Sequence, residues 1–85
     1  MILTPKQAVQ VAKIQLIIAE TAAKHGVSPK VLIDRNRLAG VAWARFEVMW
    51  RARHEAGASY ALIGHLLGDR DHSTIMNGVK RYADR

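Results

Sequence analysis

Proline and glycine divide this 85-residue chain into five stretches, each long enough for a helix. Thr4 precedes Pro5 and Ser28 precedes Pro29. A hydroxyl residue before proline is typical of a helix start, because the first turn leaves its amide hydrogens unbonded and proline lacks one. Three glycines are expected to end helices, because glycine enters the left-handed conformation without penalty: Gly26, Gly57 and Gly68.

These signals predict five helices, over about residues 5–25, 29–34, 41–56, 59–67 and 72–84. Apolar residues at helical spacing indicate the side of each helix that faces the core. They include Val41, Ala44, Val48 and Ala52, then Leu62, Ile63, Leu66 and Leu67, and finally Ile75, Val79 and Tyr82. Strand-like alternation of useful length is missing, so we expect an all-α fold. We expect one domain over residues 1–85, in which residues 1–16 form a helical extension with no assigned role.

Composition narrows the class of protein. Hydrophobic residues make up 49% of the chain, enough for a core, and the absence of cysteine excludes disulfides and thiolate metal sites. The start of the chain lacks the order of a signal peptide, and "LIIA" is too short to span a bilayer, so we expect a cytoplasmic, nucleoid-associated protein. A net charge of +6 fits a polyanionic partner such as nucleic acid.

The stretch "GDRDHSTIMNGVKR" concentrates polar side chains at the expected start of the last helix. Read as a calcium loop from Asp69, it has threonine where glycine is required and lysine where glutamate is required. The zinc-protease pattern that begins at His54 has alanine in place of its second histidine. We therefore expect no metal site.

Catalysis is also disfavoured. The neighbours Asp71, His72 and Ser73 point in different directions on a helix, which does not suit a relay from acid to base to nucleophile. A glycine-rich phosphate loop is absent as well. We expect a protein that is not an enzyme and holds no cofactor.

Two interpretations of the cluster remain. Asp71 taken alone is best explained as a helix cap, with His72 exposed and Thr74 bonded to backbone. The expected helices over 59–67 and 72–84, joined by a glycine turn, are however the pattern of a helix-turn-helix, whose second helix enters the DNA major groove. At that position His72, Ser73 and Thr74 offer donors, acceptors and a methyl group to base edges, and Asp71 suits the cytosine amino group.

These residues resemble a known family, the C-terminal DNA-binding domain of the bacterial replication initiator DnaA. Its signature Gly-Gly-Arg-Asp-His-Thr-Thr-Val is similar to "GDRDHSTI" at residues 68–75. "SYALIG" and "GVSPKVLIDRNR" resemble two upstream segments of that family, so the likeness runs from about Ile17 to Arg85. The resemblance implies a variant helix-turn-helix on a long supporting helix, which binds short asymmetric boxes in double-stranded DNA.

The resemblance also implies roles for individual residues. Base contacts fall on Asp71, His72 and Ser73, with Thr74 matching a base or phosphate contact and Arg37 matching an arginine that enters the minor groove. Contacts to the DNA backbone are implied for a further set: Arg45, Arg53, Tyr60, Ala61, Lys80 and Arg81. For any one arginine, a solvated surface charge is the alternative.

Some positions depart from the family pattern. Asp69 stands in place of the second turn glycine, Ser73 in place of a threonine, and Asn77-Gly78 in place of a His-Ala pair. Glycine inside a helix costs about 1 kcal/mol relative to alanine. The ATPase part of the initiator has no counterpart in this sequence, so we expect a DNA reader without the motor.

We therefore expect a small sequence-specific DNA-binding protein, a transcriptional regulator of bacterial, phage or prophage origin. The alternative is a module with the same fold that recruits a sigma-like factor, a polymerase or a replication component, or that competes for replication sites. Trp43, Phe46 and Trp50 fall on one side of the third helix and are expected in the core. Exposure of either tryptophan would favour a partner or self-association surface; the oligomeric state is left open.

Overall fold

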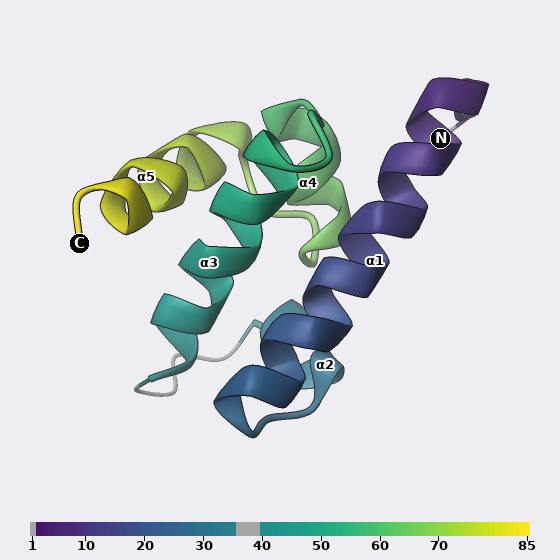
Figure 1. Cartoon of the computed structure of the whole chain (residues 1–85). Coiled ribbons are helices and arrows are strands. Elements are labelled where there is room, and N and C mark those ends of the chain that lie inside the picture. Colours follow the sequence, from purple (N-terminus) through teal and green to yellow (C-terminus); the bar gives the residue numbers. More distant parts are fainter. Residues whose placement is uncertain (1, 36–39) are drawn as a thin grey trace.

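The computed structural model describes residues 2–35 and 40–85, and the helices within them follow the expected order (Figure 1). They are α1 (Pro5–His25), α2 (Pro29–Ile33), α3 (Val41–His54), α4 (Tyr60–Leu66) and α5 (His72–Ala83). The described residues contain no strand. The all-α fold class expected from the sequence is confirmed, and α3 ends two residues earlier than expected.

The expected helix starts are present, with one difference. Thr4 and Gln7 form a capping box, with N···O distances of 3.0 and 3.1 Å between each backbone amide and the other residue's side chain. The hydroxyl of Ser59 accepts from the backbone amide of Leu62 at 3.1 Å. Ser28 occupies the N-cap of α2 but its side chain makes no capping hydrogen bond. The stop at Gly26 has a φ of 69°, the left-handed conformation that favours glycine.

The core gathers around α3, which packs against α1 on one side and α5 on the other (Figure 1). Its buried apolar residues come from every helix and from the connections on either side of α4: Ile14, Ile17, Ile18, Ala22, Leu32, Val41, Ala44, Val48, Met49, Ala52, Ala58, Leu62, Ile63, Leu67, Ile75 and Val79. Most of the residues expected on the apolar faces are among them. Leu66 and Tyr82 differ in being only partly buried.

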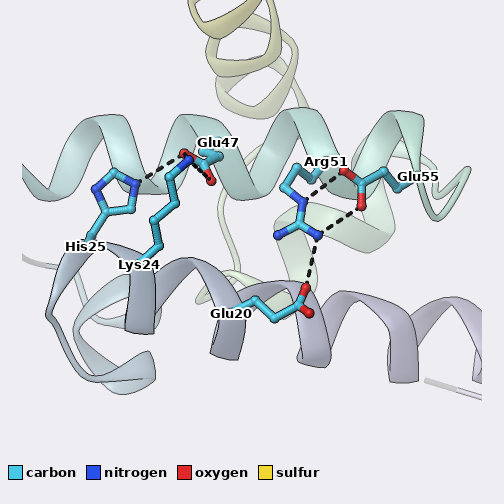
Figure 2. Close-up of polar contacts among 6 residues, drawn as sticks. All are labelled: Glu20, Lys24, His25, Glu47, Arg51 and Glu55. Atoms are coloured by element: carbon cyan, nitrogen blue, oxygen red, sulfur yellow. Dashed lines mark hydrogen bonds and ion pairs between the residues drawn. The ribbon is translucent and has the colours of Figure 1, made fainter.

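Helices α1 and α3 run antiparallel and are joined by charged side chains along their contact (Figure 2). Glu47 of α3 is only 5% exposed. Its carboxylate accepts hydrogen bonds from Nζ of Lys24 at 3.1 Å and lies 3.2 Å from Nε2 of His25. Burial raises the pKa of Glu47, but the bonds to His25 and Lys24 outweigh it, so the pKa lies below its ordinary value.

One turn further along α3, Arg51 binds two carboxylates (Figure 2). Its guanidinium donates to Glu55, the residue that directly follows α3, at 2.9 and 3.0 Å, and to Glu20 of α1 at 3.0 Å. The hydrogen bonds to Glu55 are the main cause that raises the pKa of Arg51. We call these six residues the ion-pair interface: Glu20, Lys24, His25, Glu47, Arg51 and Glu55.

The aromatic residues of α3 correct one expectation. Trp43 is 45% exposed, and only Phe46 and Trp50 are partly buried. In a helix with 3.6 residues per turn, Trp43 lies about 100° round from Ala44, away from the buried stripe. Its ring meets the ring of Phe46 edge to face, with centroids 5.5 Å apart. The expectation that Trp43 belongs to the core was therefore wrong.

The first turns of α1 reach along α4. Gln10 donates from Nε2 to the carbonyl of Gly57 at 3.2 Å, and Val11 packs against the core. The opposite side of the helix leaves Val9 and Leu16 exposed, each at 59%. Within the described residues, no helix combines the length and the apolar character that crossing a membrane requires.

Candidate nucleic-acid interface

The turn between α4 and α5 is closed by two glycines against neighbouring backbone. The amide of Arg70 donates to the carbonyl of Gly64 at 2.8 Å, and a Cβ at Gly64 would collide with the carbonyl of Arg70. Gly68 has a φ of 76°, and a Cβ there would collide with the carbonyl of Ile33 in α2. The turn can fold back on α4 because Gly64 lacks a side chain, and it can approach α2 because Gly68 lacks one.

Asp69 adopts a left-handed conformation with a φ of 56°, which is uncommon for a residue other than glycine. Aspartate is among the residues that tolerate this region best. Its Oδ1 lies 2.9 Å from Nδ1 of His65, one turn back on α4. The structure thus gives Asp69 a partner, which the sequence did not indicate.

Asp71 caps α5, as expected. Its Oδ2 accepts the backbone amide of Ser73 at 3.2 Å and also the hydroxyl of Ser73. Both bonds lower the pKa of Asp71 below its ordinary value, and the bond from the hydroxyl of Ser73 has the larger effect. Its other oxygen lies 3.6 Å from Nδ1 of His72. The first residues of α5 are therefore ordered among themselves, with the carboxylate kept ionised.

The same residues face solvent. Asp71, His72, Ser73 and Thr74 are all exposed, whereas Ile75 directly after them is buried. The structure brings the four expected base-contacting residues of this cluster together at the end of α5 nearest the turn. Arg37, the fifth expected base contact, lies outside the described residues.

Further along α5, Gly78 accounts for a close helix contact. A Cβ at this position would collide with the sulfur of Met49 and press on the ring of Phe46. The lower helix propensity of glycine is thus the cost of bringing α5 against α3. Phe46 in turn lies under the guanidinium of Arg81, 5.6 Å from the ring centroid.

The other expected backbone-contacting residues lie in different settings. Lys80, Arg81 and Ala61 are exposed. Arg53 is partly buried, with its guanidinium 4.4 Å from the ring centroid of Tyr60 and 3.0 Å from the carbonyl of Ala58. Arg53 and Tyr60 therefore form one unit at the start of α4.

Arg45 does not have the geometry expected of it. The residue is 7% exposed, and its guanidinium donates to the carbonyls of Leu32, Val31 and Asp34, each at 2.9 Å. Burial lowers the pKa of Arg45, while the charge of Asp34 opposes that change. The expected phosphate contact does not fit this position, because the guanidinium is turned toward the end of α2 and already binds backbone carbonyls there.

Two more arginines, which sequence reasoning assigned no role, meet Arg45 at the same place. Arg70 donates to the carbonyls of Ile33 at 3.3 Å and Asp34 at 3.0 Å, and also to that of Leu67. Arg35 donates back to the carbonyls of Gly68 at 3.2 Å and Asp69 at 2.8 Å. We call Arg35, Arg45 and Arg70 the arginine cluster. Its only advance signal was the arginine in the motif "RDHST".

The arginine cluster borders an open hollow between the starts of α3 and α5, with a volume of about 700 Å³. Asp69, Asp71 and Thr74 line its other side. Among the described residues, no group of three or more histidine, cysteine or acidic side chains is placed to hold a metal ion.

Comparison with known proteins gives one family. The sequence model of the family described as "Bacterial dnaA protein helix-turn-helix" matches residues 14–81. This range contains α2 to α4 entirely and most of α1 and α5. No solved structure gives a significant match.

Several curated relatives are each named "Chromosomal replication initiator protein DnaA". The protein from Herpetosiphon aurantiacus is 37% identical over 68 residues, which is 80% of this chain and 14% of the relative. That from Roseiflexus castenholzii is 36% identical over 70 residues, 82% of this chain and 15% of the relative. That from Caulobacter vibrioides is 34% identical over 61 residues, 72% of this chain and 12% of the relative.

The chain thus spans about a seventh of the length of the first two relatives. The match covers both helices joined by the glycine turn and the polar residues that follow it. On this match, the chain belongs to the bacterial DnaA helix-turn-helix family.

Proposed function

We propose that this protein binds double-stranded DNA at specific short sites through its helix-turn-helix, and that it acts by binding and not by catalysis. The observation that carries the proposal is the family match across α4, the turn and α5, together with exposed polar side chains at the start of α5. In a helix-turn-helix, these N-terminal residues of the second helix meet base edges in the major groove.

The chemistry of the exposed residues suits this role. His72, Ser73 and Thr74 offer donors, acceptors and a methyl group, and Asp71 accepts from the cytosine amino group. In the free protein, the hydroxyl of Ser73 and the carboxylate of Asp71 bind each other. The two side chains are therefore already ordered for a DNA site that offers a hydrogen-bond donor. At a site without such a donor, the carboxylate is only repelled by the phosphates, which weakens binding there.

The basic residues supply contacts that do not depend on sequence. Lys80 and Arg81, exposed on α5, are proposed to bind phosphates, as are Arg53 and the start of α4 at Tyr60 and Ala61. Arg37 is proposed to enter the minor groove. A net charge of +6 favours such contacts and predicts a strong dependence of affinity on salt.

Selection of bound sequences from a random duplex pool tests the proposed function. The expected result is enrichment of one short asymmetric motif, bound more weakly as the salt concentration rises. Random duplexes bound as well as the enriched pool would contradict sequence-specific recognition. A protein that retains no duplex at low salt would contradict DNA binding altogether.

The roles along α5 can be separated with two alanine variants. His72→Ala should weaken binding to the selected site by about 1–3 kcal/mol and leave random duplex binding nearly unchanged. Arg81→Ala should weaken both alike and reduce the slope of log affinity against log salt by about one. Equal losses for His72→Ala on both duplexes would remove it from the base contacts, and an unchanged slope would remove Arg81 from the phosphate contacts.

For the biological role, we propose a small transcriptional regulator of bacterial, phage or prophage origin. A second candidate is recruitment of a protein such as a sigma-like factor, a polymerase or a replication component, with or without competition for replication sites. The 45% exposure of Trp43 favours it, because an exposed tryptophan is typical of interaction surfaces. If Trp43→Ala leaves DNA affinity intact and abolishes regulation in cells, the second role is supported.

A further inference from the structure

We infer that Arg70 is a positioning residue for DNA reading: without contacting DNA, it fixes the start of α5 and so determines sequence preference. The inference rests on the proposed function. It starts from the observation that the arginine of the motif "RDHST" turns away from the surface that its neighbours Asp71 and His72 present to solvent.

The guanidinium of Arg70 links three parts of the chain. It donates within the turn to the carbonyl of Leu67, and across to α2 it donates to the carbonyls of Ile33 and Asp34. Burial lowers the pKa of Arg70, and the nearby charges of Arg45 and Arg35 lower it further. The groups it binds are backbone carbonyls, and two cations stand beside it, so the carbonyl groups are what stabilise its position.

The end of α2 suits this arrangement. The last carbonyl groups of a helix have no partner within the helix and carry a partial negative charge. The carbonyl of Asp34 accepts from Arg70 at 3.0 Å and from Arg45 at 2.9 Å. One acceptor therefore joins α3, through Arg45, to the turn that leads into α5.

The rest of α5 is held in a different way. In the middle of the helix Gly78 packs against Met49 and Phe46, and near its far end the ring of Tyr82 lies 5.8 Å from that of Trp50, so both parts are placed on α3. Near the start of α5, Ile75 alone is buried among the first four residues. Arg70 is adjacent to the N-cap, so loss of its bonds would release the start of α5 while leaving its far end in place.

Base reading depends on this placement. A binding constellation must be held within about 0.5 Å of its productive geometry by residues that support it. A phosphate contact tolerates more displacement, because a charge acts over a longer distance than a hydrogen bond. Release of the start of α5 should therefore reduce the preference for the cognate site more than the affinity for DNA in general.

The test is Arg70→Lys, which retains the charge but loses the planar fork that binds several carbonyls. We expect the preference for the selected site over random duplex to fall by about tenfold, random duplex affinity to change by less than about twofold, and the salt slope to stay the same. Amide hydrogen exchange of Thr74 and Ile75 should become faster than in the unchanged protein, because both amides bond to the carbonyl of Asp71 next to the turn.

Arg51→Lys is the matched control. It makes the same substitution at a partly buried arginine in the ion-pair interface, away from the turn. We expect it to leave the site preference unchanged. If Arg70→Lys does not fold, Arg45→Lys replaces it, because Arg45 shares the carbonyl of Asp34 and should give the same loss of preference.

The outcomes are distinguishable. If the unchanged protein prefers no duplex, the proposed function fails and the inference fails with it. If the unchanged protein has a preference that Arg70→Lys retains, only the inference is overturned. Equal losses on both duplexes with a smaller salt slope would overturn it too, by making Arg70 a phosphate contact.

Discussion

The ion-pair interface and the arginine cluster both use charged side chains to join helices, but their partners differ in kind. Between α1 and α3, basic side chains meet carboxylates: Glu47 binds Lys24 and His25, and Arg51 binds Glu20 and Glu55. At the end of α2, the cations of the arginine cluster meet neutral backbone carbonyls. The first contact depends on the charge of its acids, and the second depends on backbone geometry.

This difference predicts how each region responds to change. Acid removes the charge of a carboxylate, but a carbonyl has none to lose. A side chain added at a glycine displaces backbone, which the arginine cluster cannot tolerate if its acceptors are to stay in place. We therefore expect the stability contributed by the ion-pair interface to depend on pH. The stability contributed by the region of the arginine cluster should instead depend on the size of the side chains at its glycine positions.

Gly64→Ala should produce the largest effect. The added Cβ would collide with the carbonyl of Arg70, so we expect the free energy of unfolding to fall by about 3 kcal/mol, measured by urea denaturation. Gly26→Ala is the control, because nothing lies within 4 Å of a Cβ there and only its φ of 69° opposes the change. We expect the control to lose about 1 kcal/mol of the free energy of unfolding. Equal losses in the two variants would show that the collision at Gly64 is not the cause of its effect.

Glu47→Gln should have a smaller effect, of about 2 kcal/mol at neutral pH, because the amide that replaces the buried carboxylate keeps an acceptor but loses the charge that attracts Lys24. The folded protein keeps the pKa of Glu47 below its ordinary value of 4.5, so its stabilisation is present above that value and is lost as the pH falls through the lower pKa. The free energy of unfolding should fall less steeply below pH 4.5 in Glu47→Gln than in the unchanged protein. If the free energy of unfolding falls equally steeply with acid in both proteins, Glu47 is not a source of the pH dependence.

Arg51→Lys should have the smallest effect, about 0.5 kcal/mol. Its carboxylate partners Glu20 and Glu55 are half exposed, so water and salt screen the interaction. Urea denaturation in low and high salt measures this contribution, which should shrink as salt is added. A loss as large as that of Glu47→Gln would mean that exposure does not separate the two pairs.

Much of the fold follows from local signals in the sequence. Thr4 and Asp71 were expected to cap helices, and each side chain accepts a backbone amide from the first turn of its helix. Such signals act over three or four residues, so one sequence is enough to find them. The apolar stripe of α3 at Ala44 and Val48 was found in the same way.

The remaining features depend on contacts between distant parts of the chain. Arg45 lies 11 to 14 residues from the carbonyls that it binds, and Arg70 lies 36 residues from Asp34. A sequence shows a basic residue but not whether it turns outward to a phosphate or inward to a carbonyl. Trp43 was misplaced for a related reason: three aromatics share one side of α3, but the buried stripe at Ala44 and Val48 lies on another side.

The length of α1 has a practical consequence for experiments. At about 1.5 Å per residue, the 21 residues of this helix extend for roughly 30 Å, close to the longest dimension of the molecule, 35 Å. The beginning of α1 and the end of α5 lie at opposite sides of the fold (Figure 1). A dye or surface tether attached near Thr4 would therefore stand well clear of the end of α5, which makes it the natural attachment point for single-molecule tests of the proposed DNA binding.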